Sequence, residues 1–316
     1  MTTVRAFTFP GQGSQAVGMG KALAEAYGAA REVFEQVDDA LGEPLSRLMF
    51  EGPEEELVLT RNAQPALMAV SLAVVRVLEA ESGKSIGDMA SYVAGHSLGE
   101  YSALAAAGAL DVADAAKLLR LRGESMQTAV PVGEGAMAAL LGVSLELAQE
   151  VAAAGAADGG VCDIANDNAE GQVVISGSKA AVEKAVAAAA EKGARKSVLL
   201  PVSAPFHCGL MAPAADAMAE ALATTDLRQP VVPLVANVLA DKISDPREIR
   251  TRLVEQVTGM VRWRESVLWL AGQGVTEIVE LGSGKVLTGL AKRIDRSLAG
   301  RAVGTPEEIA AFLETL

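Results

Sequence analysis

Residues 92–100 read Tyr-Val-Ala-Gly-His-Ser-Leu-Gly-Glu, and this stretch decides both the fold class and the chemistry that the sequence predicts. Residues 92–95 are a short apolar run typical of a buried strand, and an alanine-rich helical stretch follows the serine to about Gly108. A G-x-S-x-G pattern between a strand and a helix forces a sharp turn that exposes the serine hydroxyl. Unpaired N–H groups at the helix N-terminus can stabilise an oxyanion, so Ser97 is a candidate nucleophile. The alternative is an ordinary tight turn in which Ser97 caps the helix.

Strand-like and helical stretches alternate on both sides of this motif. Short apolar runs end in glycine-rich turns and are followed by alanine- and leucine-rich stretches, as in a parallel sheet covered by helices. Residues 4–9 predict a first strand, and Gln12 in the turn after it either offers a second N–H group to an oxyanion or is an ordinary turn residue. Pro65 predicts the first turn of a helix that runs to about residue 79. Asp111 is expected to cap the helix that follows it.

A different order of elements is predicted between residues 131 and 203. The pattern indicates four strands, two helices and a connection through Asn166-Asp167-Asn168, with strands at 136–143, 161–165, 172–176 and 196–202 and helices at 145–154 and 179–191. This βαββαβ order is the ferredoxin-like arrangement. We therefore predict an α/β protein with an α/β-hydrolase-like large domain that contains a parallel sheet (1–130 and 204–316) and an inserted small ferredoxin-like domain (131–203).

Composition excludes several classes of function. The chain has 316 residues and a net charge of −13, so it is a poor general binder of nucleic acid or of anionic membranes. Its two cysteines, Cys162 and Cys208, lack CxxC spacing and indicate a reducing compartment rather than a metal site. The N-terminus has no long apolar stretch, and the most apolar helical stretch, 66–78, is too short to span a bilayer. We expect a cytoplasmic protein without a metal or cofactor.

The candidate base is one of only two histidines. His96 adjoins the serine, and at the predicted turn its side chain should point elsewhere. His207 follows the last strand of the predicted small domain, where it is expected to face a cleft between the domains, and we predict that it activates Ser97. The alternative is a structural histidine. No acid between Ser97 and His207 has a distinctive context, so an acid, a backbone carbonyl or an amide stays open as the group that orients the imidazole.

Arg122 is the most informative charged residue. Its neighbours at helical spacing are Leu118, Leu119 and Met126, so it lies on the apolar face of its helix, whereas Arg120 lies on the outer face. An inward guanidinium is costly without an anionic partner. That partner is either a structural carboxylate or a substrate carboxylate held by the bidentate fork, and we favour the substrate.

The stretch 285–301 is the clearest local basic patch in this acidic chain. It holds one acid, Asp295, and five cations, namely Lys285, Lys292, Arg293, Arg296 and Arg301. The patch is either a solvated helix face or a site for an acidic partner.

Seven motifs in chain order together resemble the malonyl-CoA:acyl carrier protein transacylases of bacterial fatty acid synthesis. They cover nearly the whole chain and comprise Phe9-Pro10-Gly11-Gln12-Gly13-Ser14-Gln15, Gln64-Pro65-Ala66-Leu67, Gly95-His96-Ser97-Leu98-Gly99-Glu100-Tyr101, Arg122-Gly123, Asn166-x-Asn168, Pro205-Phe206-His207 and Gly282-Ser283-Gly284-Lys285-Val286-Leu287.

The resemblance implies a role for each matching residue. Ser97 would be acylated and His207 would be the base, while Arg122 would hold the free carboxylate of malonate. Gln12 and Leu98 would supply the N–H groups that bind the oxyanion, and a backbone carbonyl of Gln256 would orient the histidine. Asn166 and Phe206 would line the substrate pocket. Phe206 matches the malonyl-selecting form of its segment.

We therefore predict a ping-pong acyltransferase that moves malonyl from malonyl-CoA to the phosphopantetheine thiol of an acidic acyl carrier protein, and we expect a monomer. The rivals are a free-standing acyltransferase of a polyketide or malonate decarboxylase pathway, a serine thioesterase, and a carrier-binding scaffold without activity. A thioesterase would have an acid behind its histidine and little need for an inward Arg122.

Overall fold

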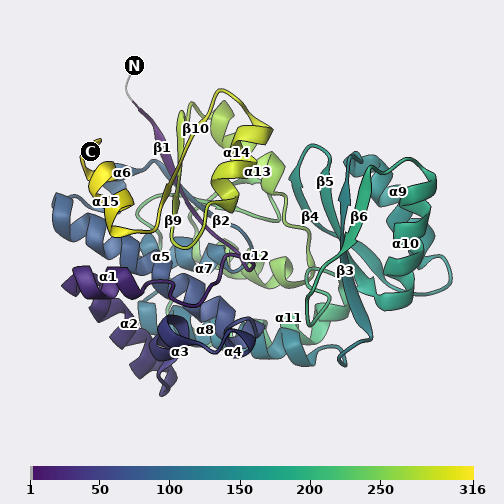
Figure 1. Cartoon of the computed structure of the whole chain (residues 1–316), viewed down its shortest axis with the longest axis horizontal. Helices are drawn as coiled ribbons and strands as arrows, with labels where there is room; N and C mark the ends of the chain where they lie inside the picture. The colour runs from purple at the N-terminus through teal and green to yellow at the C-terminus, as the bar shows by residue number, and fades with distance from the viewer. Residues whose placement is uncertain (1–2) are drawn as a thin grey trace.

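The computed structural model describes residues 3–316, which form a large and a small lobe side by side (Figure 1). A six-stranded sheet in the order β10-β9-β1-β2-β7-β8 crosses the large lobe. Its strands are β1 (Arg5–Phe9), β2 (Tyr92–Gly95), β7 (Leu234–Ala236), β8 (Asp241–Ile243), β9 (Glu277–Leu281) and β10 (Ala299–Val303). All neighbours are parallel except β7 and β8. The predicted α/β class and parallel sheet are confirmed, with one antiparallel edge strand added.

Helices cover both faces of this sheet and bury its central strands β1, β2, β7 and β9. Ala6 of β1 packs with α13 (Trp263–Gly272) and α14 (Val286–Ile294), whereas Phe7 and Phe9 face the opposite core. That core contains most other large-lobe helices, among them α2 (Gly28–Leu41), α5 (Thr60–Ser82), α7 (Gly99–Ala106), α8 (Val112–Thr128), α11 (Ala212–Thr224), α12 (Pro246–Thr258) and α15 (Pro306–Leu313). Short helices complete the lobe: α1 (Lys21–Ala26), α3 (Leu45–Glu51), α4 (Glu54–Leu57), α6 (Ile86–Met89) and a 3-10 turn (Gly209–Met211).

Helix α5 begins five residues earlier than the sequence predicts. The N–H groups of Asn62 and Ala63 donate to the Leu59 carbonyl, so Pro65 lies in the second turn and the prediction that it opens the helix is wrong. Burial of nearly the whole helix in the core outweighs the missing proline hydrogen bond. At 23 residues α5 is also longer than predicted, and it has the length and hydropathy of a membrane span, but 83% of its most apolar window is buried inside the protein.

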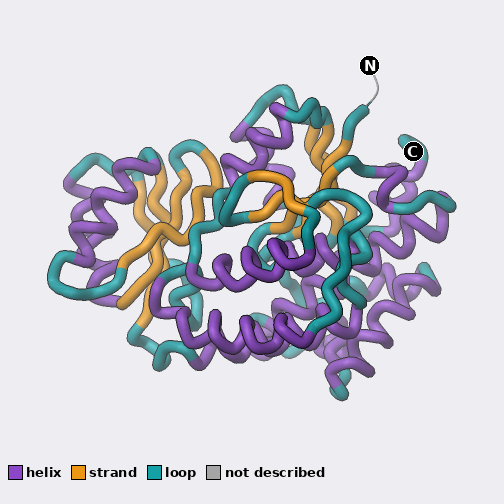
Figure 2. The backbone as a smooth tube through the Cα atoms, turned by 180° about the vertical axis from the view of Figure 1, so that it is seen from behind, coloured by secondary structure: helices purple, strands orange, loops and turns teal. Residues whose placement is uncertain are grey.

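The small lobe has the predicted βαββαβ order, built from β3 (Gly135–Leu141), α9 (Leu145–Ala156), β4 (Cys162–Ala169), β5 (Gln172–Ser178), α10 (Lys179–Glu191) and β6 (Lys196–Leu199). Its antiparallel sheet has the order β4-β5-β3-β6, and both helices cover the outer face (Figure 2). The prediction that residues 166–168 connect two strands is wrong, because they pair along β4 and the chain turns at Glu170 and Gly171 instead. The domain limits 131 and 203 stay a prediction.

Strand β4 also ties the small lobe to the large one. The Val261 N–H donates to the Ala165 carbonyl at 2.8 Å, and the Asp167 N–H donates to the Val261 carbonyl at 3.0 Å. Beside this bridge, Arg264 Nε lies 2.8 Å from Asp167 Oδ2, whose side chain is almost fully buried. The lobes are therefore joined by backbone pairing and an ion pair as well as by the connecting chain.

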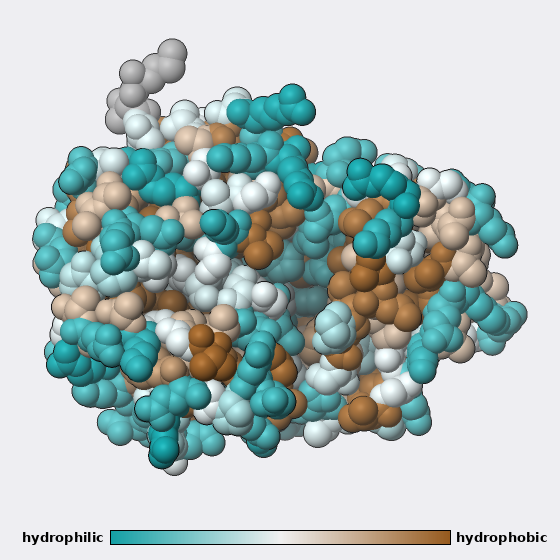
Figure 3. Space-filling view, viewed as in Figure 1, coloured by the Kyte–Doolittle hydropathy of each residue, from teal (hydrophilic) through white to brown (hydrophobic). Residues whose placement is uncertain are grey.

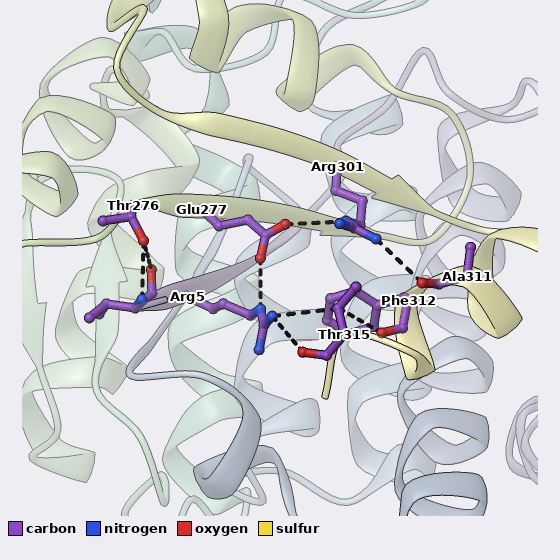
Figure 4. A network of polar contacts seen from close by, with 8 residues as sticks. Arg5, Thr276, Glu277, Arg301, Ala311, Phe312 and Thr315 are labelled. Carbon is purple, nitrogen blue, oxygen red and sulfur yellow. Dashed lines mark hydrogen bonds and ion pairs between the residues drawn. The ribbon is translucent and has the colours of Figure 1, made fainter. Parts of the chain in front are cut away.

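A polar cluster around Glu277 joins strands β1, β9 and β10 at one side of the large sheet (Figure 4). Arg5 Nε lies 2.7 Å from one oxygen of Glu277, and Arg301 Nε lies 3.2 Å from the other. Both guanidinium groups also lie over the Phe312 ring, 5.4 and 5.6 Å from its centroid. Arg301, which the sequence grouped with the basic stretch 285–301, is thus engaged in holding helix α15 to the sheet.

Asp111 stands at the N-terminus of α8 as predicted, but its carboxylate makes no capping hydrogen bond. It pairs with Arg228 instead. The local signal for a helix start is correct here, while the predicted capping contact is wrong because a residue distant in sequence supplies a charged partner.

Candidate active site

A cavity of about 600 Å³ lies where the two lobes meet. Figure 3 shows the surface hollowed between the lobes, with hydrophobic residues along the small-lobe side. The cavity is lined by both lobes and by the segment that returns from the small lobe. From the large lobe come Gln12, Gln64, Ser97, Leu98, Arg122 and Met126. From the small lobe and the returning segment come Met137, Asn166, Leu200, Val202, Phe206 and His207. The structure therefore brings together candidates that lie up to about two hundred residues apart in the sequence.

Ser97 occupies a sharp turn between β2 and α7. Its φ of 54° lies in the left-handed region that non-glycine residues avoid. The turn is possible because a Cβ at Gly95 would meet the Gly99 carbonyl group at 1.9 Å, and a Cβ at Gly99 would meet the Phe9 oxygen at 2.3 Å. The pairing of Phe9 with Gly95 also brings the Gln12 turn beside the serine. The predicted sharp turn between a strand and a helix is found, and its left-handed serine is a feature that the sequence did not predict.

His207 is the hydrogen-bond partner of the serine. Its Nε2 lies 2.8 Å from Ser97 Oγ, while its Nδ1 lies 2.8 Å from the Gln256 carbonyl and 3.2 Å from the Gly259 carbonyl. Carbonyl oxygens only accept hydrogen bonds, so we assign the proton to Nδ1 and the free lone pair of Nε2 to the serine. Burial and the nearby Arg122 charge lower the pKa of His207 to about 3, which keeps the imidazole neutral and able to accept a proton.

No carboxylate contacts this imidazole among residues 3–316, and two backbone carbonyls orient it. Of the alternatives that the sequence left open, the structure therefore favours the carbonyl. The other histidine, His96, is turned away from the serine as predicted: its Nε2 lies 2.8 Å from Asn168 Oδ1 and its ring lies beside Trp263.

Arg122 is almost completely buried, with 1% of its surface exposed, and its guanidinium reaches the nucleophile. It donates to Gln64 Oε1 and to Gln256 Oε1, both at 2.8 Å, and to Ser97 Oγ at 3.1 Å. All three acceptors are uncharged, and no Asp or Glu lies at ion-pair distance among the described residues. The structural carboxylate that sequence analysis held open as its partner is therefore not found in residues 3–316.

Two N–H groups beside the serine are free to bind an oxyanion. In the part of the chain described, 3–316, neither the Gln12 N–H nor the Leu98 N–H donates a hydrogen bond, and both residues line the cavity. The Ser97 N–H is not available, because it donates to Asn237 Oδ1 at 2.8 Å. The geometry thus fits the two predicted oxyanion donors.

The remaining candidates divide into cavity residues and supporting residues. Asn166 and Phe206 line the cavity as the predicted substrate pocket requires. Gln256 does not line it and is completely buried, so it acts on the site through His207 and Arg122 rather than by touching a substrate.

Sequence reasoning missed the roles of Glu100 and Asn237. Glu100 lies three residues after Ser97, directly behind the serine motif. It is almost completely buried, and the sequence gives no sign of this because most glutamates are exposed. Asn237 is 140 residues from the serine, and only its position directly after β7 points to the sheet edge where Ser97 lies.

Comparison with known proteins shows the family. A family model described as an acyl transferase domain matches residues 6–295. The chain belongs to the acyl transferase family. This acyl transferase is 47% identical over 311 residues to the malonyl CoA-acyl carrier protein transacylase of Bacillus subtilis (strain 168), covering 98% of this chain and 96% of that protein.

Solved structures resemble the acyl transferase over its whole length. The acyl-carrier-protein-S-malonyltransferase of Bartonella henselae is 57% identical with a TM-score of 0.96, covering 99% of each chain. A malonyl-transacylase solved in complex with a type II PKS acyl-carrier protein is 43% identical with a TM-score of 0.95, covering 99% of this chain and all of that one. The expected family and the two-lobed fold class are confirmed.

Proposed function

We propose that the enzyme transfers malonyl from malonyl-CoA to the phosphopantetheine thiol of acyl carrier protein through an ester on Ser97. The observation that carries this proposal is the buried guanidinium of Arg122, 3.1 Å from Ser97 Oγ and bonded only to neutral groups. A charged fork beside a nucleophile fits an acyl group that ends in a carboxylate. The names of the relatives support the same substrate and acceptor.

In the first half-reaction, Ser97 Oγ forms a bond to the thioester carbon while His207 Nε2 takes the hydroxyl proton. The carbonyl oxygen becomes an oxyanion between the N–H groups of Gln12 and Leu98, each contributing about 3 kcal/mol in the transition state. The C–S bond then breaks, and the leaving CoA sulfur takes the proton from His207. The malonyl carboxylate stays on Arg122.

In the second half-reaction, the carrier thiol gives its proton to His207 and attacks the ester carbon. The same N–H groups hold the second oxyanion, the bond to Ser97 Oγ breaks, and His207 returns the proton to that oxygen. Each step restores the groups used in the one before, so no cofactor is needed for the transfer.

Two observations favour transfer over hydrolysis. A thioesterase of this architecture would place an acid behind its base, and here carbonyls occupy that position. Hydrolysis also gives no reason to bury a guanidinium beside the serine. We place the enzyme in fatty acid synthesis, as a monomer in the cytoplasm. One relative was solved in complex with a type II PKS acyl-carrier protein, so a polyketide pathway is the alternative setting for the same reaction.

Intact mass spectrometry tests the proposal. Incubation with malonyl-CoA should add one malonyl group, which a phosphopantetheinylated carrier protein should then remove. Acetyl-CoA should give little adduct, and Ser97→Ala should give none. Free CoA accumulating without an adduct would indicate a hydrolase, and neither adduct nor turnover would indicate a scaffold.

We also propose that exposed cations on and beside α14 dock the acidic carrier protein: Lys285, Lys292, Arg293 and Arg296. The segment that carries Lys285 contacts a loop of the cavity: the hydroxyl of Ser283, two residues before Lys285, donates to the Ser14 carbonyl at 2.7 Å, and both neighbours of Ser14 line the cavity. Such a surface steers an acidic partner, and its effect should weaken with added salt.

Charge reversal of Lys285 and Lys292 to glutamate should raise the KM for the carrier about tenfold or more at low salt, because steering attraction becomes repulsion. The rate of malonyl-CoA loading should not change, because the cavity is untouched. Lys117→Glu is the matched control, because Lys117 is an exposed residue of helix α8, which lies away from α14 (Figure 1). Equal effects on both half-reactions would rule out docking at α14.

A further inference from the structure

Glu100 is a buried carboxylate that the mechanism above does not use. It lies in the first turn of α7 with 1% of its surface exposed. Its Oε1 accepts from the Asn237 N–H at 2.6 Å, and its Oε2 accepts from the side-chain amide of Gln256. Both partners come from segments more than 130 residues away, so one carboxylate joins three parts of the chain.

Asn237 connects Glu100 to the strand side of the nucleophile turn. Its Nδ2 donates to the Gly95 carbonyl at 2.7 Å, and its Oδ1 accepts from the Ser97 N–H at 2.8 Å. The peptide groups on the N-terminal side of the serine are therefore held by a residue whose own backbone is held by Glu100.

Gln256 connects Glu100 to the reacting groups themselves. Its Nε2 also donates to the Ser97 carbonyl at 2.9 Å, and its Oε1 accepts from Arg122. Its backbone carbonyl accepts from His207 Nδ1. One residue thus touches the nucleophile, the arginine and the base, and its side-chain amide is oriented by the acceptor at Glu100.

We propose that Glu100 is a positioning residue for acyl transfer: by accepting from both Asn237 and Gln256, its ionised carboxylate holds Ser97, His207 and Arg122 in their mutual geometry. This inference rests on the proposed function in that its measured step is the acylation of Ser97. Displacements of about 1 Å remote from the chemistry can cost on the order of 100-fold in rate.

The protonation state matters because both partners of Glu100 are donors. An ionised carboxylate accepts from both, whereas a protonated carboxyl or a glutamine presents a hydrogen where one acceptor is needed. Burial raises the pKa of Glu100 to about 8, against the opposing effects of its N–H donors and the Arg122 charge. Arg122 on α8 and Tyr101 on α7 are the charged or titratable groups that face it, while Asn237 and Gln256 are neutral.

The other titratable groups of this network change state outside the neutral range. The pKa of His207 is lowered to about 3 by burial and by Arg122, and burial raises the pKa of Tyr101 to about 12. Between pH 6 and 9 the network therefore changes mainly through Glu100, and protonated wild type should behave like Glu100→Gln.

The test is the single-turnover rate constant of Ser97 malonylation from pH 6 to 9, by rapid quenching and intact mass, normalised to the fraction of protein that reacts. At pH 9 we expect the rate constant of wild type to be about tenfold or more above that of Glu100→Gln. At pH 6 we expect the ratio of the two rate constants to fall toward one. Glu280→Gln is the matched control, because Glu280 is an equally buried carboxylate that accepts from the N–H groups of Leu287 and Thr288 away from the cavity. It should leave the normalised rate unchanged.

If Glu100 only stabilised the fold, Glu100→Gln would lose folded protein, and the ratio of the two normalised rate constants would not depend on pH. That result would overturn the proposal, and so would equal rate constants for wild type and variant at pH 9. If Glu100→Gln does not fold, the wild-type profile decides, since a rate that does not rise between pH 6 and 9 is incompatible with it. Absence of any malonyl adduct on wild type would instead refute the proposed function.

Discussion

His207→Ala is expected to slow malonylation of Ser97 by about 10⁴-fold, the upper end of the contribution of a positioned general base. The reason is geometric: His207 Nε2 is 2.8 Å from Ser97 Oγ, and the only other histidine is bonded to Asn168 instead. Single-turnover rates measured by intact mass would give the value directly.

The matched control is His96→Ala, which removes the nearer histidine in sequence and should cost less than about tenfold, because the side chain it deletes makes no contact with the reacting oxygen. Malonylation of His207→Ala within tenfold of wild type would exclude this residue as the base.

The surroundings of His207 predict an unusual dependence of the malonylation rate on pH. With a pKa lowered to about 3 by burial and by Arg122, His207 stays unprotonated far below the ordinary histidine value of 6.5. In a Glu100→Gln background, which removes the other titration, the rate should be flat from pH 5 to 9. An inflection near 6.5 would contradict the assigned surroundings of the imidazole.

Arg122→Ala is expected to reduce kcat/KM for malonyl-CoA by about 10²–10³-fold, as loss of one partner of a buried charge pair does. The rate with acetyl-CoA should stay the same or rise, because the penalty of an unpaired buried guanidinium is removed. Comparing kcat/KM for the two thioesters measures the loss of selectivity.

Arg120→Ala is the control for this prediction, since Arg120 lies two residues away on α8, is partly buried and bonds Glu43 and Asn62 instead of the nucleophile. It should retain the wild-type selectivity. Arg122→Lys should recover only part of it, because an ammonium cannot reproduce the planar fork between Gln64 and Gln256. Strong malonyl preference in Arg122→Ala would disprove carboxylate binding at this position.

Sequence patterns predict this fold best where local signals and long-range packing agree. Strand β2 and helix α10 have the predicted bounds, and the order of elements in the small lobe is correct. Errors occur where a contact distant in sequence outweighs the local signal. Pro65 marks a helix start locally, but core burial extends α5 before it, and residues 166–168 resemble a turn but pair with β5 and with Val261.

The same distinction separates the site residues that the sequence could reveal from those that it could not. Ser97, His207 and Arg122 could be found because each belongs to a rare pattern: a sharp turn, one of two histidines, and an inward charge. Glu100 and Asn237 could not be found, because their roles depend on hydrogen bonds between segments far apart in the sequence. No spacing of residues in the sequence indicates these bonds.

The backbone bridge between β4 and Val261 limits how this enzyme can be recombined with its relatives. An exchange of residues 131–203 would replace the strand that pairs with Val261 and the carboxylate of Asp167, but leave the recipient's Val261 and Arg264 in place, so both contacts would have to form between parts of different proteins. We therefore expect the small lobe, although contiguous in sequence, to depend on this contact with the large lobe. A chimera that preserves the width of the cleft must transplant the segment around 261–264 together with the lobe it is paired to.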